Sequence, residues 1–211
     1  MNLAKKITHI ALVLGALPVA ALAADYGTVY TQLSTNGPGI GFAASVAPNW
    51  AARGQVNVFK QSFSGNVGDF GSNAVLTMDI NFNTVPLLAD WYPGEGGFRL
   101  SGGVVFNNNK ITIAGSGNVN NKPATVNAEI KFSDSISPYV GIGYATRPKD
   151  AKGFGFNYDL GVMFQNPKVS MTATGTGVTQ ADIDAQVVTV QDAMNNLKTM
   201  PVFGIGFSYS F

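Results

Sequence analysis

The 211-residue sequence contains no cysteine and only one histidine, His9. Without cysteine there is no disulfide framework and no thiolate ligand for a metal. His9 lies in an N-terminal stretch that we expect to be removed, so the usual ligands of transition metals and the usual nucleophile–base pairs are missing. Carboxylates remain as acid–base groups, but no nucleophile accompanies them. The sequence therefore predicts no enzyme activity, no metal site and no cofactor.

Charge is also scarce. Charged residues make up 12% of the chain, about half of the ~25% that is typical of soluble domains. The chain has 13 lysines and arginines against 12 acidic residues, and removing Lys5 and Lys6 leaves 11 against 12. A mature net charge of about −1 offers nothing to attract nucleic acid.

Long apolar runs are absent beyond the N-terminal region. Residues 1–23 read MNLAKKITHIALVLGALPVAALA, with two lysines, a short apolar run and a final Ala-Leu-Ala. This order predicts a secretory signal peptide, cleaved after Ala23 or Ala24, followed by a single domain over 24–211. The alternative is a membrane anchor, which is disfavoured because Gly15 and Pro18 interrupt a run that must reach ~20 residues to span.

What the chain does contain is alternation with a period of two. In the last eleven residues, PVFGIGFSYSF, large apolar side chains alternate with glycine and serine, which indicates a strand with one face toward a narrow space. Eight such stretches are bounded by turn residues: 26–34, 39–47, 51–63, 73–91, 97–114, 125–145, 153–174 and 201–211. An even number of strands, low charge and abundant aromatic residues favour an all-β fold, an eight-stranded antiparallel transmembrane β-barrel with both termini periplasmic. A secreted β-sandwich is the alternative, but it usually carries more surface charge.

The two faces of the strands differ in chemistry. Within 125–145 the even-numbered residues are apolar except for Asp134, and most odd-numbered ones are polar or glycine; 153–164 largely repeats this pattern, as expected when apolar side chains face lipid. A change of phase near Pro86 predicts a β-bulge. Aromatic residues fall near strand ends, which suggests an interfacial girdle. This parity assigns seven charged residues to the lumen: Arg53, Asp79, Asp90, Arg99, Glu129, Lys131 and Asp159.

These charges have two interpretations. In the first, the charges form a closed, ion-paired core, because a barrel of eight strands is just wide enough for its own side chains to fill it. In the second they gate a narrow conduit whose ion pairs separate to admit small solutes.

One segment has a helical pattern instead. Thr179 and Asp182 match a capping box, and apolar residues then recur at intervals of four and three from Ile183 to Leu197. We expect a short helix that Pro201 ends, in the last extracellular loop, where it forms a lid or simply packs on its own loop. The Val-Val-Thr-Val run within it favours a strand instead.

Short motifs add a resemblance. The stretches SPYVGIGY (137–144), FQNPKVSMT (164–172), GFRLSGGVVFNNNK (97–110), LLADWYP (87–93) and the terminal FSYSF resemble small outer-membrane proteins of the OmpW and CarO kind, and the architecture is similar to the OmpA membrane domain. The resemblance implies insertion by the barrel-assembly machinery, which reads a C-terminal aromatic strand, here Phe207, Tyr209 and Phe211. Such proteins pass small hydrophobic or zwitterionic molecules, or have no open pore.

Two functions therefore stand as hypotheses. The first is a monomeric, porin-like narrow channel for small molecules in the outer membrane of a Gram-negative bacterium. The second is a closed structural or surface-interaction protein that acts through its extracellular loops. In both, the expected partners are the lipid bilayer and the lipopolysaccharide of that membrane.

Overall fold

In the computed structural model, residues 27–66, 75–132, 135–146, 150 and 152–211 are described; the predicted signal peptide lies outside them. The described part contains eleven strands and one helix. The elements are β1 (Gly27–Ser34), β2 (Gly37–Ala47), β3 (Trp50–Asn66), β4 (Val75–Trp91), β5 (Phe98–Asn107), β6 (Lys110–Val119), β7 (Lys122–Lys131), β8 (Ser135–Tyr144), β9 (Gly153–Phe164), β10 (Lys168–Thr174), α1 (Gln180–Asn195) and β11 (Thr199–Ser210).

Eight of these strands close into a barrel. Around the ring their order is β1, β2, β3, β4, β5, β8, β9 and β11, every neighbouring pair is antiparallel, and β11 returns to β1. The predicted eight-stranded antiparallel barrel is therefore confirmed. Closure leaves no free edge in the ring, so every strand can pair on both sides.

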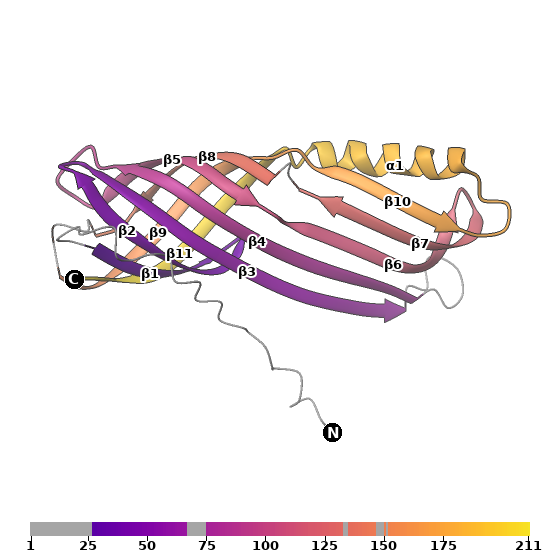
Figure 1. The fold of residues 1–211 in the computed structure, drawn as a ribbon, viewed down its shortest axis with the longest axis horizontal. Helices are drawn as coiled ribbons and strands as arrows, with labels where there is room; N and C mark the ends of the chain where they lie inside the picture. The colour runs from indigo at the N-terminus through magenta and orange to yellow at the C-terminus, as the bar shows by residue number, and fades with distance from the viewer. Residues whose placement is uncertain (1–26, 67–74, 133–134, 147–149, 151) are drawn as a thin grey trace, which may run out of the picture.

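The other three strands continue part of the barrel wall outward. The half of β4 near Trp91 pairs with β5, whereas its other half, Leu76–Asn81, pairs with β6. Beyond β6 come β7 and then β10. We call the outer parts of β3 and β4 together with β6, β7, β10 and α1 the extension; it projects from the barrel end opposite the C-terminus (Figure 1).

Three of the predicted strands are each divided where the barrel meets the extension. The stretch 97–114 becomes β5 and β6, 125–145 becomes β7 and β8, and 153–174 becomes β9 and β10. The bulge predicted near Pro86 is wrong, because the register between β3 and β4 is the same from Trp50–Trp91 to Asn66–Val75. The irregularity lies instead between β2 and β3, at Ser45 and Ala47.

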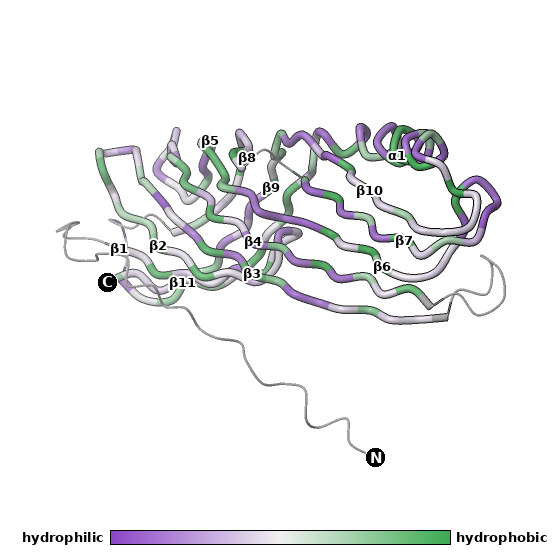
Figure 2. Tube along the Cα trace, turned by 45° about the vertical axis from the view of Figure 1, so that its right-hand side comes forward, coloured by the Kyte–Doolittle hydropathy of each residue, from purple (hydrophilic) through white to green (hydrophobic). Residues whose placement is uncertain are grey.

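Within the barrel, most large apolar side chains point outward, and most inward side chains are polar or small. On β3, Arg53 and Asn57 are buried while Val56 and Val58 are exposed. On β11, Phe203, Ile205 and Phe207 are exposed, and the small residues between them face the interior. The alternation of hydrophobic and hydrophilic residues is visible along the strands in Figure 2.

In the extension this relation is inverted. The registers put Phe82, Ile80 and Met78 of β4 on the face that continues the lumen wall, next to Ile111 and Ile113 of β6. The opposite face, which continues the outside of the barrel, carries polar residues: Lys60, Ser62, Asp79, Asn81, Lys110, Thr112, Asn127, Glu129, Lys131, Lys168, Ser170 and Thr172. The change of phase near Pro86 therefore reflects a change of surroundings and not an extra residue.

The predicted helix is confirmed, including its capping box between Thr179 and Asp182. It runs beside β10 (Figure 1), where Val169 N donates to Gln191 Oε1 at 2.9 Å. Because β10 has no further strand beside it, this contact covers a sheet edge. Pro201 does not end the helix, which stops at Asn195; the proline lies in β11. Among the described residues, no helix is long and apolar enough to cross a membrane.

Candidate functional site

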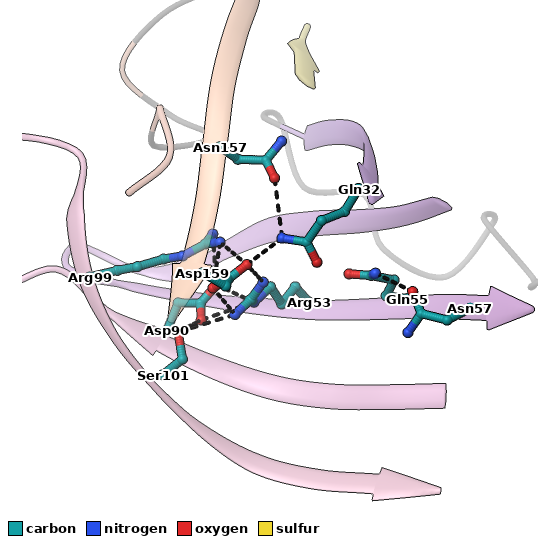
Figure 3. A network of polar contacts seen from close by, with 9 residues as sticks. All are labelled: Gln32, Arg53, Gln55, Asn57, Asp90, Arg99, Ser101, Asn157 and Asp159. Carbon is teal, nitrogen blue, oxygen red and sulfur yellow. Dashed lines mark hydrogen bonds and ion pairs between the residues drawn. The ribbon is translucent and has the colours of Figure 1, made fainter. Parts of the chain in front are cut away.

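Four of the predicted lumen residues meet at one level of the barrel. Arg53 comes from β3, Asp90 from β4, Arg99 from β5 and Asp159 from β9, and we call these four residues the ion-pair cluster (Figure 3). In a ring of eight strands, β3 and β9 stand four places apart, so they face each other across the barrel. The contact between Arg53 and Asp159 therefore spans the lumen.

Each carboxylate of the cluster bridges both guanidinium groups. Arg53 Nε lies 2.9 Å from Asp90 Oδ2, and its Nη2 lies 2.9 Å from Asp159 Oδ1. Arg99 approaches Asp90 Oδ2 at 3.3 Å and Asp159 Oδ2 at 3.0 Å. The two positive and two negative charges cancel, and Arg53 donates two parallel hydrogen bonds to Asp159, the strong bidentate geometry of this pair.

Burial makes this pairing necessary. The exposed fractions of the four residues range from 0% for Asp90 to 6% for Asp159. Removing one member of a buried ion pair leaves an uncompensated charge, which costs about 3–5 kcal/mol. The cluster therefore holds its four strands at one relative position.

Neutral groups complete the coordination of the carboxylates. Ser101 Oγ donates to Asp90 Oδ1 at 2.6 Å, and Gln32 Nε2 donates to Asp159 Oδ2 at 2.6 Å. Sequence reasoning did not identify these two residues, although both have the inward parity of their strands. Parity alone cannot distinguish a short polar side chain that binds a charge from one that only fills space.

An apolar layer lies within the same barrel. It consists of buried side chains that form one cluster: Leu88, Val105, Tyr139, Met163 and Val202. Sequence reasoning missed this layer because it expected only polar residues inside. Beside it is a cavity of about 30 Å³, whose lining includes Arg53, Asp159, Gln32, Asn57 and Asn36. That volume is large enough to hold at least one water molecule.

Glycine provides the room that these large side chains need. A Cβ at Gly143 on β8 would lie 2.9 Å from Asp159 Oδ1 and 3.2 Å from Arg99 Nε. A Cβ at Gly204 on β11 would lie 2.6 Å from Gln32 Cδ. The small face of the C-terminal strand thus leaves space for the side chain that binds Asp159.

The other three predicted lumen residues lie outside the lumen. Asp79, Glu129 and Lys131 are on the outer face of the extension, where Glu129 is 3.5 Å from Lys110 Nζ and 3.3 Å from Lys131 Nζ. The prediction that these three residues face the lumen is wrong, because in the extension the polar residues lie on the face that continues the outside of the barrel. The hydrogen bond from Lys131 and the charges of both lysines lower the pKa of Glu129.

The four residues of the ion-pair cluster form a buried, charge-neutral polar core within the barrel. Across the described ranges, no group of three histidine, cysteine or acidic side chains is placed to hold a metal ion. The described part therefore contains polar contacts that hold the barrel strands in one arrangement, and a small cavity beside those contacts.

Comparisons with known proteins identify the fold. The chain is similar to the crystal structure of CarO from Acinetobacter baumannii, with a TM-score of 0.58 and 23% identity over 88% of this chain and 97% of that one. It is also similar to CarO2 from the same organism, with a TM-score of 0.59 and 19% identity over 88% and 98%. No protein-family model matches the sequence, and no curated protein matches it either. The resemblance predicted from the short motifs is thus confirmed as a CarO-like barrel fold.

Proposed function

We propose that this protein is an outer-membrane barrel that is closed in this state and acts through its extension. The membrane location is supported by the exposed outer surface of the barrel. Large apolar side chains are exposed around the ring, among them Leu33, Ile40, Leu87, Val140, Leu160 and Ile205. Soluble monomers rarely expose contiguous apolar patches beyond a few hundred Å², whereas such a band is what a lipid-facing barrel carries.

Aromatic residues support one orientation in that membrane. The rings of Trp50 and Trp91 stack with centroids 6.4 Å apart, and Phe154 and Tyr209 meet at 5.1 Å. These residues lie at the strand ends on the side of the C-terminus, the level of an interfacial girdle. We therefore place the termini in the periplasm and the extension outside the cell, with Phe207, Tyr209 and Phe211 as the assembly signal.

The closed state rests on one observation, the interlocked ion-pair cluster. Its contacts run from β3 to β9, on opposite walls, and no member is more than 6% exposed. A solute that follows the barrel axis has to separate these charges in a region without bulk water. That separation is expensive, which favours a structural or surface-interaction role over an open pore.

Slow, gated passage is the second candidate function. The observation that favours it is the cavity beside Arg53 and Asp159. The lining of this cavity also includes Asn36, whose buried Oδ1 has no hydrogen-bond partner in the described part of the chain. In this candidate the cavity is one end of a path that opens when the cluster rearranges.

Solute flux into liposomes that contain the refolded protein distinguishes the two. Small sugars, amino acids and an apolar reporter are compared with protein-free liposomes, for the natural sequence and for Arg99→Ala. For a closed core we expect no flux in either protein and lower stability for Arg99→Ala. Flux that rises in Arg99→Ala supports the gate instead. Glu129→Ala is the control: Glu129 lies outside the lumen, so its loss should leave flux unchanged and lower stability by at most about 1 kcal/mol.

The membrane location has its own test. A barrel that inserts into lipid migrates differently on a semi-native gel before and after heating. A refolded protein that stays soluble without lipid and shows no such shift would rule out the outer-membrane assignment.

A further inference from the structure

The sheet of the extension has two lateral borders, and within the described residues only one of them is covered. Along the order of its strands, β10 stands at one border and the outer half of β3 at the other (Figure 1). At β10, the Gln191 side chain of α1 accepts a hydrogen bond from Val169 N at 2.9 Å and donates one to Pro167 O at 2.8 Å. At β3, no described strand pairs with the residues after Asn57 on the side away from β4.

This border of β3 begins where β2 stops pairing with it. The last pair in the direction of the extension is Gly39–Asn57, and the next residue of β2 is Pro38, which has no N–H to donate to the ladder. We call Lys60–Ser64 of β3 the open edge. All five of its residues are exposed. It contains no proline and only one charged residue, so it has few of the features that protect sheet edges from pairing.

The backbone groups of alternate residues point out of the open edge. Val56 O lies on the β2 side of β3, because a Cβ at Gly39 would be 2.8 Å from it. The register of β3 against β4 is unchanged from there to the end of the strand. In such a ladder every second residue directs its N–H and C=O to the same side. Three residues of the open edge therefore direct both groups outward: Lys60, Ser62 and Ser64.

The side chains at the open edge agree with this direction. Gln61 Nε2 donates to Ser62 O at 3.1 Å, which is a contact between exposed groups that an added strand can replace. On the inner face, Phe59 and Phe63 flank Gln61 and are 37% and 50% exposed. A strand laid along the open edge would therefore form backbone hydrogen bonds and cover apolar surface at the same time.

We propose that the open edge binds an extended polypeptide segment of a protein outside the cell, which adds to the sheet as a further strand. The proposal rests on the outside position of the extension given above, and it names the class of partner through which the extension acts. An extended main chain offers donors and acceptors at the spacing of the outward groups of β3. Apolar side chains at alternate positions would cover Phe59 and Phe63, and an acidic one suits the place beside Lys60.

A second copy of this chain fits the open edge less well. The outer half of β3 runs away from the barrel (Figure 1), so two copies in one membrane direct their β3 strands the same way. Their open edges would have to pair in parallel, which is the less stable ladder. A free segment can approach in the antiparallel direction.

Binding of a labelled synthetic peptide to the refolded protein in detergent micelles tests this. The peptide alternates valine and threonine, has one central glutamate, and carries N-methyl groups along one edge so that it cannot stack on itself. Because its other edge keeps its N–H donors, we expect saturable binding by fluorescence anisotropy. A peptide that is N-methylated along both edges has the same side chains and should not bind.

Hydrogen exchange locates the bound peptide on the protein. We expect amide protection to rise at Lys60, Ser62 and Ser64 when the peptide binds. Protection should change little at Gln61 and Phe63, whose N–H groups face β4. This alternation distinguishes an added strand from a peptide that lies on the face of the sheet.

Variants at two positions have opposite expected effects. Ser62→Pro removes an outward N–H and leaves the ladder to β4 intact, so it should weaken binding about tenfold or more. Ser62→Ala is the matched control, because it also loses the contact of the hydroxyl with Asp79 but keeps the N–H, and it should bind as the natural sequence does. Gln61→Ala releases Ser62 O and should strengthen binding, which a damaged fold would not do.

Three results would overturn the proposal. They are equal binding of both peptides, protection that rises away from the open edge, and concentration-dependent dimers that Ser62→Pro abolishes without any binding of peptide, which would identify a second copy as the partner. Insertion into lipid is followed in parallel on the semi-native gel. Normal insertion without peptide binding rejects the open edge alone, whereas failure to insert rejects the membrane location on which it rests.

Discussion

The barrel and the extension use the same strands with opposite faces. Along β3 the inward residues change from Arg53 and Asn57 in the barrel to Phe59 and Phe63 in the extension, with no change of register against β4. The outward residues change from Val56 and Val58 to Lys60 and Ser62. A period of two therefore reports that a strand has two different faces, but the surroundings decide which of them is apolar.

The largest expected difference in stability is between removing a charge inside the barrel and removing one on the extension. Asp159→Ala leaves Arg53 and Arg99 buried with one carboxylate between them, so we expect a loss of about 3–5 kcal/mol in unfolding free energy. Glu129→Ala removes exposed pairs on the extension and should cost at most about 1 kcal/mol. Urea unfolding of the two refolded variants in lipid measures both. Equal losses would contradict the idea that the cluster is the core of the barrel.

A charge added to the outer face should also change stability by different amounts in the barrel and in the extension. Val140→Arg on β8 places an arginine in the apolar band and should destabilise the protein by about 2–4 kcal/mol if lipid covers that surface. Asn127→Arg on β7 lies on the polar outer face of the extension and should stay within about 0.5 kcal/mol. The two are compared by unfolding in lipid. A small effect at Val140 would argue against a lipid-facing band.

The barrel and the extension also differ in how much room there is for a side chain at their glycines. Gly143→Ala brings a Cβ to 2.5 Å from the backbone oxygen of Tyr158 and 2.9 Å from Asp159 Oδ1, and we expect a loss of about 1–3 kcal/mol from overpacking. Gly117→Ala on β6 meets no atom within 4 Å and should be close to neutral. A neutral result at Gly143 in the same unfolding assay would mean that both the β9 backbone at Tyr158 and the cluster can move to make room.

Much of the barrel could be predicted from the sequence. The alternation of apolar and polar residues predicted eight barrel strands. The odd or even position of each residue along its strand placed Arg53, Asp90, Arg99 and Asp159 inside. Both predictions were possible because lipid on one side and a narrow core on the other constrain which residues can occupy each face. The helix was predictable from its cap, since Thr179 and Asp182 satisfy each other's backbone groups locally.

The extension could not be recognised in the same way. Its strands keep the period of two, so parity carried Asp79, Glu129 and Lys131 into the lumen. The break between β7 and β8 shifts the parity, whereas β5 and β6 keep one register against β4, and nothing in the composition of Phe132 marks the break. Nor could the partners Gln32 and Ser101 be identified, since contacts across the ring depend on the shear and width of the closed barrel.

The smallest expected effect is confined to the tip of the extension and depends on pH. Asp182 accepts hydrogen bonds from Lys122 Nζ at 2.7 Å, Asn120 Nδ2 at 2.6 Å and Thr179 N at 3.0 Å. These bonds, that from Lys122 first, hold the pKa of Asp182 well below its ordinary value. A depressed pKa stabilises the folded form above the unfolded value of about 3.9, and this stabilisation is lost as the pH falls toward the folded pKa.

Hydrogen exchange of the first turn of α1 measures this loss. After correction for intrinsic rates, we expect protection there to decrease as the pH is lowered from 5 to below 4, while the barrel strands stay protected. Asp182→Asn should show the reduced protection already at pH 7, with little further dependence on pH. Asp184→Asn is the control, because Asp184 accepts a hydrogen bond from Gln180 within the same helix. If protection in Asp182→Asn matched that of the natural sequence at pH 7, the join between α1 and the β6–β7 turn would rest on apolar packing around Ile183 instead of on this carboxylate.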